Sequence, residues 1–184
     1  QLDEWPLEKK FMWGGTEAEF MELYVTATRH LKGCFPDLKI GGPSLCYDLA
    51  WADRFLARLR KENLPLDFFS WHAYMREPSA ISEKAFKVDA LLKKHGYGDV
   101  EHILNEYNYV RGWGVDWPYT LRSDQGVKGG SFIAATMSLC QSAPVDKLMY
   151  YDARPCAMNG LFSFDEYDPR PGYWAYIAWR NLRR

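Results

Sequence analysis

The segment Asp67-Phe68-Phe69-Ser70-Trp71-His72-Ala73-Tyr74 decides the fold class, because it is a nearly continuous apolar run that ends in polar side chains. A run of this length without strict alternation is typical of a strand covered on both faces of a parallel sheet. Strands are also predicted at residues 38–43, 101–107 and 147–152. The sequence therefore predicts four strands.

Helical periodicity occupies the stretches before and between these strands. Residues 17–31 carry apolar side chains at helical spacing, with Thr16 as a predicted N-cap and Gly33 as a predicted stop. Strands that alternate with helices imply right-handed crossovers and a parallel α/β sheet. The other predicted helices cover residues 48–61, 82–95 (closed by Gly96), 126–141 and 173–182.

The composition excludes several classes of protein. The chain has 184 residues, of which 47% are hydrophobic and 26% charged, with a formal net charge of −1. The apolar content argues against disorder, and the balanced charge argues against nucleic acid as a partner. No apolar run reaches the roughly 18–20 residues of a membrane helix. Because the chain begins with Gln1 rather than Met, we expect a processed or truncated product, and its cellular location stays unassigned.

Metal and cofactor sites are not predicted. The cysteines form no Cys-x-x-Cys pair, which excludes metal-finger and thioredoxin-like sites. No glycine-rich phosphate loop follows a strand, since Pro43 stands where a helix-opening amide is needed. The four cysteines are Cys34, Cys46, Cys140 and Cys156.

Polar residues gather at the carboxyl ends of the predicted strands. In a (β/α)8 TIM barrel, the active site lies at this end of the strands. Four strands are half of the eight that such a barrel needs, and an unrelated open parallel α/β sheet is an alternative. The residues are Ser44, then His72 and Tyr74, then Asn105 and Glu106, then Asp152 and Arg154.

Glu106 is the strongest candidate for chemistry, because it ends an apolar run and is surrounded by Asn and Tyr side chains. A carboxylate held by such donors suits the nucleophile of a retaining glycosidase, which forms a covalent glycosyl-enzyme. A Glu in an ordinary strand-end hydrogen-bond network is the alternative.

His72 and Tyr74 lie two residues apart, so alternation puts both on one face of their strand. We expect His72 to donate to a sugar hydroxyl and Tyr74 to bond the Glu106 carboxylate, although a buried core histidine is an alternative. Rings in the following segments predict a platform for sugar C–H faces, or a small hydrophobic cap. These rings are Trp113, Trp117, Tyr119, Phe162 and Phe164.

Three segments together, residues 35–43, 67–74 and 103–108, resemble family 39 of the glycoside hydrolases. The resemblance implies a retaining clan A TIM barrel of the β-xylosidase and α-L-iduronidase type. It implies that residues 1–184 are the C-terminal half of the catalytic barrel, with strands five to eight and their helices. Residues 1–15 would be the loop that follows the missing fourth strand.

The same resemblance implies roles for single residues. Glu106 corresponds to the nucleophile, His72 to the histidine that contacts the sugar, and Tyr74 to a neighbour that supports the nucleophile. Asn105 stands where the family often has Thr. We expect further substrate contacts from Asn105, Trp113, Trp117 and Asp152.

The family's general acid/base lies in an Asn-Glu-Pro segment, and this chain contains none. Glu4 is the nearest carboxylate to that expected position, but it lacks the preceding Asn and a strand. We therefore expect a β-xylosidase-like glycosidase that lacks its acid/base and is inactive as an isolated fragment. A non-catalytic carbohydrate-binding module is the alternative.

The expected partners follow from these assignments. A glycoside or oligosaccharide is the expected substrate, with no nucleic acid, membrane or cofactor. Because half a barrel leaves sheet edges and apolar surface uncovered, we also expect pairing with an N-terminal half or with a second copy.

Overall fold

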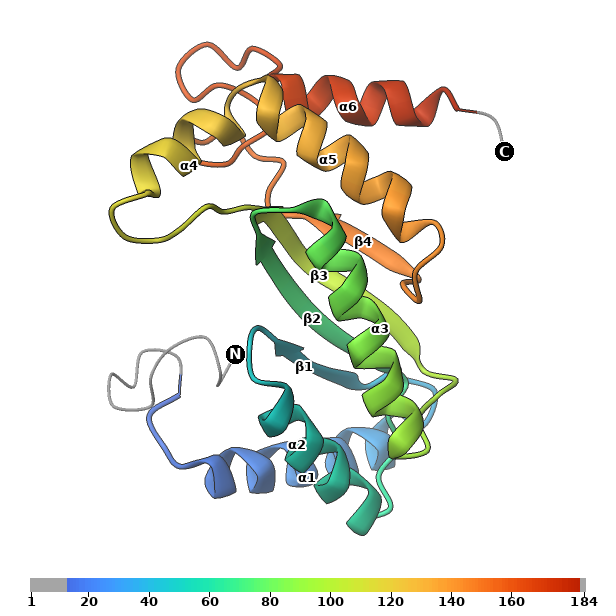
Figure 1. The fold of residues 1–184 in the computed structure, drawn as a ribbon. Helices are drawn as coiled ribbons and strands as arrows, with labels where there is room; N and C mark the ends of the chain where they lie inside the picture. The colour runs from blue at the N-terminus through green and yellow to red at the C-terminus, as the bar shows by residue number, and fades with distance from the viewer. Residues whose placement is uncertain (1–12, 183–184) are drawn as a thin grey trace. The chain divides into compact units, whose positions relative to one another are not determined.

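The computed structural model describes residues 13–182, which form a four-stranded sheet with the order β1-β2-β3-β4 and six helices (Figure 1). The sheet is parallel, as the sequence predicted, and Gly41 lies opposite Phe68 where β1 and β2 begin to pair. The strands are β1 (Gly41–Leu45), β2 (Phe68–Met75), β3 (Glu101–Tyr109) and β4 (Lys147–Tyr150). The helices are α1 (Glu17–Cys34), α2 (Leu49–Lys61), α3 (Pro78–Lys94), α4 (Trp117–Asp124), α5 (Val127–Cys140) and α6 (Pro171–Arg180).

The chain divides into two compact units, one made of residues 1–72 and 87–103 and the other of residues 73–86 and 104–184. In the first unit, apolar side chains of α2 form the core, because Phe55, Leu56 and Leu59 recur at helical spacing and are fully buried. Asp48 begins this helix by accepting a hydrogen bond from the Trp51 backbone N–H at 2.9 Å.

In the second unit, α5 packs against α6 around a buried cluster of Ile133, Met137 and Leu161. The aromatic side chains Tyr173, Tyr176 and Trp179 of α6 pack against this cluster while remaining partly exposed. Leu148 and Tyr150 of β4 also pack against this cluster.

The start of α1, which was predicted from the capping residue Thr16, is confirmed. The Thr16 side chain accepts from the Glu19 backbone, and the Glu19 carboxylate accepts from the Thr16 backbone at 2.6 Å, which makes a capping box. The predicted stop at Gly33 is wrong. The helix continues through Gly33 to Cys34, and the Phe35 N–H still donates to Leu31 at 2.7 Å.

The first strand begins at Gly41, three residues later than predicted. The segment before it is held by side chains instead of by a strand ladder. The Asp67 carboxylate accepts from the Ile40 N–H at 2.8 Å, and Lys32 donates to the Leu38 carbonyl at 2.7 Å. Asp67 lies 27 residues from Ile40 in the sequence, and the apolar pattern of the segment does not reveal either contact.

Helix α3, strand β4 and the segment before α5 also differ from the prediction. Helix α3 begins at Pro78, four residues early, because a proline is compatible with the first turn of a helix. Strand β4 ends at Tyr150, so Asp152 lies in the loop after it. The aromatic-rich segment between β3 and α5, where no helix is predicted, contains α4, which carries Trp117 and Tyr119.

Two expectations lie outside the described residues. They concern most of the predicted loop over residues 1–15 and the carboxylate of Glu4. Within the described residues, no helix is long and apolar enough to span a membrane.

Candidate active site

The site is built on β2 and β3, which are neighbours in the sheet. The Tyr74 hydroxyl, near the end of β2, donates a hydrogen bond of 2.5 Å to Oε2 of Glu106 on β3. This hydrogen bond fixes the orientation of the carboxyl group. Both side chains are only partly buried, so solvent still reaches the carboxyl group. The predicted hydrogen bond between these two residues is confirmed.

The direction of the Glu106 side chain follows from its neighbour on the strand. Tyr107 is fully buried, and its hydroxyl lies 3.0 Å from the hydroxyl of Tyr176 on α6. Burial raises the pKa of Tyr176 to about 12, so this hydroxyl pair stays neutral. Because successive side chains of a strand point to opposite faces, Glu106 faces away from α6. The same alternation puts Asn105 on the face of Tyr107, and its predicted contact with substrate stays a prediction.

Two indole rings extend the site from the strand ends toward solvent. Trp113 meets the ring of Tyr74 edge-on, with ring centres 5.4 Å apart and an interplanar angle of 71°. Trp117 stacks on Trp113 with centres 5.1 Å apart and an angle of 22°. Trp113 is 56% exposed. Carboxyl, hydroxyl and two indoles therefore form one continuous series of contacts.

The loop that carries Trp113 is anchored to α4 by a buried hydroxyl. The Thr120 Oγ1 accepts from the Arg111 backbone N–H at 3.1 Å and donates to the Gly112 carbonyl at 3.3 Å. The Arg111 side chain forms an ion pair with Asp116 at 3.1 Å across the same loop. Four polar contacts of this kind, with the Trp117 N–H donating to Gly114 at 3.0 Å, hold the indoles in place.

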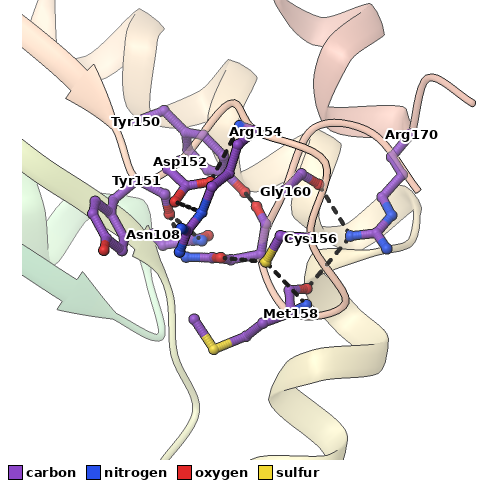
Figure 2. A network of polar contacts seen from close by, with 10 residues as sticks. Asn108, Tyr150, Tyr151, Asp152, Arg154, Cys156, Met158, Gly160 and Arg170 are labelled. Carbon is purple, nitrogen blue, oxygen red and sulfur yellow. Dashed lines mark hydrogen bonds and ion pairs between the residues drawn. The ribbon is translucent and has the colours of Figure 1, made fainter. Parts of the chain in front are cut away.

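Asp152 belongs to a second polar cluster in the loop after β4 (Figure 2). Its carboxylate pairs with the Arg154 side chain at 2.8 Å and also accepts from the Arg154 backbone N–H at 3.2 Å. The carbonyl of Tyr151 accepts from the Asn108 amide at 2.9 Å and from the Asn159 amide at 2.7 Å. The peptide bond between Tyr151 and Asp152 is cis.

Asn108 connects this second cluster to the Glu106 strand. It lies two residues after Glu106, so both side chains point to the same face of β3. The amide of Asn108 therefore holds the Asp152 loop beside the strand that carries the candidate nucleophile. Asn108 is not among the predicted site residues. Its spacing of two residues from Glu106 is the sequence feature that indicates a place on the same face of the strand.

The far side of the loop is fixed by Arg170, whose guanidinium donates to the carbonyl of Gly160 at 3.1 Å (Figure 2). Buried Asp124 lies within electrostatic range of this arginine. Burial raises the pKa of Asp124 to about 8, and the charge of Arg170 offsets only part of that rise. Oδ1 of Asp124 has no hydrogen-bond partner among residues 13–182. No pattern in the sequence marks this carboxyl as buried.

The remaining predicted residues lie in separate surroundings. His72 is fully buried on β2 in the first unit, where Ser70 accepts a hydrogen bond from the Ser44 N–H at 3.0 Å. Its contact with a sugar stays a prediction. Phe162 packs on Tyr173, with ring centres 5.1 Å apart, and so forms part of the α5–α6 core and not of an exposed platform.

Tyr119 contacts cationic side chains instead of the two stacked indoles. The Arg111 guanidinium lies 4.6 Å from its ring centre, and Lys128 donates to its hydroxyl at 3.2 Å. These hydrogen-bonded and charged neighbours lower the pKa of Tyr119. Within the described part of the chain, no three His, Cys, Asp or Glu side chains are grouped to hold a metal ion.

Solved structures define the class of this fold. A monomeric beta-xylosidase from Caulobacter crescentus superposes with a TM-score of 0.78 at 17% identity, over 95% of this chain and 40% of that one. A glucosidase from Croceicoccus marinus superposes with a TM-score of 0.73 at 26% identity, over 91% of this chain and 36% of that one. The chain is thus an α/β protein of the TIM-barrel type with four parallel strands.

The family follows from the sequence match. Residues 3–117, more than half of the chain, match the model of glycosyl hydrolases family 39, and the chain belongs to this family. A beta-xylosidase from Caldicellulosiruptor saccharolyticus is 36% identical over 69 residues, which span 38% of this chain and 14% of that protein. A beta-xylosidase from Geobacillus stearothermophilus is 27% identical over 109 residues, which span 49% of this chain and 22% of that protein.

Proposed function

We propose that this chain is part of a retaining, β-xylosidase-like glycosidase in which Glu106 is the nucleophile. The observation that carries the proposal is the Tyr74 hydroxyl on Oε2 of Glu106 at the carboxyl ends of two neighbouring parallel strands. Active sites of TIM barrels lie at this end of the strands. Membership of glycosyl hydrolases family 39 supports a glycoside as the substrate.

The reaction takes two steps. Glu106 attacks the anomeric carbon as the bond to the leaving oxygen breaks, and a second carboxyl group protonates that oxygen. Water then attacks the covalent glycosyl-enzyme, the second carboxyl takes its proton, and Glu106 leaves as a carboxylate. Tyr74 holds the Glu106 carboxyl in the orientation that the attack requires.

The second carboxyl group comes from outside this chain in our proposal. Retaining glycosidases place their two carboxyls about 5–5.5 Å apart. The sequence contains no Asn-Glu-Pro segment, which is where the family resemblance puts the acid/base. The chain also spans only 36% and 40% of the two solved structures described above, which leaves room for that segment elsewhere in the barrel.

We further propose that the chain is the C-terminal half of the barrel, with β1 to β4 as strands five to eight, and that it pairs with the rest. Strands β1 and β4 lie at the two ends of the strand order, and Met149 on β4 is 45% exposed. Helix α6 is almost entirely apolar in sequence, yet Gly172 is its one buried residue and Trp174 is 57% exposed. An apolar helix of this kind is usually covered by another element.

The proposal is tested in the complete enzyme that contains this chain. A 2-deoxy-2-fluoroxyloside with a dinitrophenyl leaving group should trap the glycosyl-enzyme, and peptide mapping should find the label on Glu106. Glu106→Gln should lose at least a thousandfold in kcat. Glu101→Gln is the matched control, because Glu101 is on the same strand and pairs with Lys39. A label on another carboxyl, or turnover that survives Glu106→Gln, would overturn the assignment.

A binding module without turnover is the second candidate, because the exposed Trp113–Trp117 stack offers a sugar platform that does not need Glu106. The two candidates separate in one experiment. Calorimetric binding of a xylo-oligosaccharide that persists in an enzyme with neither turnover nor labelling would favour the binding module.

A further inference from the structure

We infer that Trp113 is a positioning residue for the nucleophile, because its indole holds Tyr74 against the carboxyl group of Glu106. The inference rests on the proposed function and deepens it. It gives Trp113 a role in orienting the nucleophile, which is separate from stacking on a sugar. The geometry that carries it is the edge-on contact of Trp113 with Tyr74, at 5.4 Å between ring centres.

Tyr74 needs such support because of its place on the strand. It is the next-to-last residue of β2 and is only partly buried, whereas the three residues before it, Trp71 to Ala73, are fully covered. A tyrosine ring at the open end of a strand can turn about its side-chain bonds, and that rotation would take its hydroxyl off Oε2 of Glu106. The indole of Trp113, which packs edge-to-face with the ring of Tyr74, restricts this rotation.

Trp113 is itself held firmly enough to restrain another ring. Trp117 stacks on it at 5.1 Å, and the buried hydroxyl of Thr120 fixes the backbone of Arg111 and Gly112 just before it. Since Trp113 is 56% exposed, its removal would not empty the core of the unit. A substitution there should therefore leave the fold intact and release Tyr74.

The two-step reaction offers a readout that separates positioning from stacking on the leaving group. A ring that only stacks on the leaving-group sugar acts in the first step, because that sugar has departed before the second. A ring that orients Glu106 acts in both steps, since Glu106 is the nucleophile in the first and the leaving group in the second. A ring that stacks on the sugar attached to Glu106 also acts in both steps, and the double variant with Tyr74 described below separates that case from positioning.

The test uses the complete enzyme and a 2,4-dinitrophenyl xyloside, whose good leaving group makes breakdown of the glycosyl-enzyme limiting. Rapid-mixing measurements give the burst and the steady-state rate for Trp113→Ala, Trp113→Phe and Val115→Ala. Trp113→Ala should lower both rates by about tenfold, and Trp113→Phe should recover most of the loss because it restores a ring against Tyr74. Val115→Ala is the control on the same loop, and it should leave the breakdown rate near that of the wild type because Val115 is fully exposed.

A double variant tests the route through Tyr74. If Trp113 acts by holding Tyr74, adding Trp113→Ala to Tyr74→Phe should cause little further loss in the breakdown rate, because contacting residues are not additive. Additive losses, or a wild-type breakdown rate in Trp113→Ala, would overturn the inference and leave the nucleophile assignment intact. Absence of the Glu106 label in the wild type would instead overturn the proposed function and this inference together.

Discussion

The Tyr74 hydroxyl is the group whose removal tests the site most directly, because it donates to Oε2 of Glu106 and the tyrosine side chain is only partly buried. Hydrogen bonds to charged groups contribute about 1.5–3 kcal/mol. Tyr74→Phe should therefore lower kcat/KM of the complete enzyme by about ten- to hundredfold, as measured by steady-state hydrolysis of an aryl xyloside. Tyr119→Phe is the matched control, since Tyr119 contacts Arg111 and Lys128 and should leave the rate unchanged.

Asp124 should make the stability of the folded chain depend on pH. Burial raises its pKa to about 8 in the folded chain, whereas the pKa of an aspartate in an unfolded chain is about 3.9. Between these values the folded state binds the extra proton, so the free energy of unfolding falls as pH rises through this window. The fall is on the order of 1.4 kcal/mol for each unit by which the two pKa values differ. Asp124→Asn should flatten it, which chemical denaturation at a series of pH values would measure.

The control for this measurement lies on the same segment of chain. Asp116, just before α4, is 41% exposed and paired with Arg111, so Asp116→Asn is the matched control for the loss of an exposed carboxyl. An unchanged slope in Asp124→Asn would show that this carboxyl is not the group that titrates.

Two glycines in helices should respond to substitution in opposite directions. A Cβ at Gly33, in the last turn of α1, would meet nothing within 4 Å, whereas a Cβ at Gly129, in the first turn of α5, would collide with the backbone carbonyl of Asp124. Gly33→Ala should stabilise the chain by about 0.5–1 kcal/mol. Gly129→Ala should destabilise it by about 1–3 kcal/mol, because backbone must move.

Urea unfolding of both variants measures the two changes. The pair is its own control, since each variant adds the same methyl group to a helix of the same chain. Stabilisation by Gly129→Ala would contradict the close approach of α5 to the end of α4.

Local pattern was enough to find most elements, and the exceptions show where it fails. Helices α1 and α2 have strong apolar periodicity and capping side chains, Thr16 and Asp48, within three residues of their targets. Helix α4 has only eight residues and lies in an aromatic-rich segment where no helix is predicted. The start of β1 depends on Asp67, a partner 27 residues away.

The same distinction applies to the candidate site, where some contacts follow from local pattern and others do not. Tyr74 and Glu106 could be paired from sequence, because neighbouring parallel strands and side-chain alternation fix their relative positions. The bonds from Asn108 and Asn159 to the Tyr151 carbonyl depend on the path of a loop. The burial of Asp124 depends on how α4 packs in the second unit. Neither these hydrogen bonds nor the burial of Asp124 is indicated by a local pattern in the sequence.

The isolated chain should associate with itself, because apolar surface on β4 and α6 is exposed. Met149 is 45% and Trp174 57% accessible to solvent. Light scattering of the 184-residue chain should give a mass above that of the monomer, and a dye that reports apolar surface should bind. Trp174→Glu should reduce both signals, and Lys147→Glu, a change of an exposed charged residue on β4, should not.

The outcome that would contradict this expectation is a uniform monomer that binds no dye. Such a result would also remove the support that the exposed face lends to pairing with the rest of a barrel.

The indole stack gives the molecule an optical property of its own. Two indoles whose centres lie 5.1 Å apart and whose planes differ by 22° couple their electronic transitions. They should therefore contribute an exciton pair to the far-ultraviolet circular dichroism, beside the bands of helices and strands. A ligand that settles on the exposed ring of Trp113 changes the surroundings of one chromophore only, so the protein carries a built-in optical reporter of occupancy at its candidate active site.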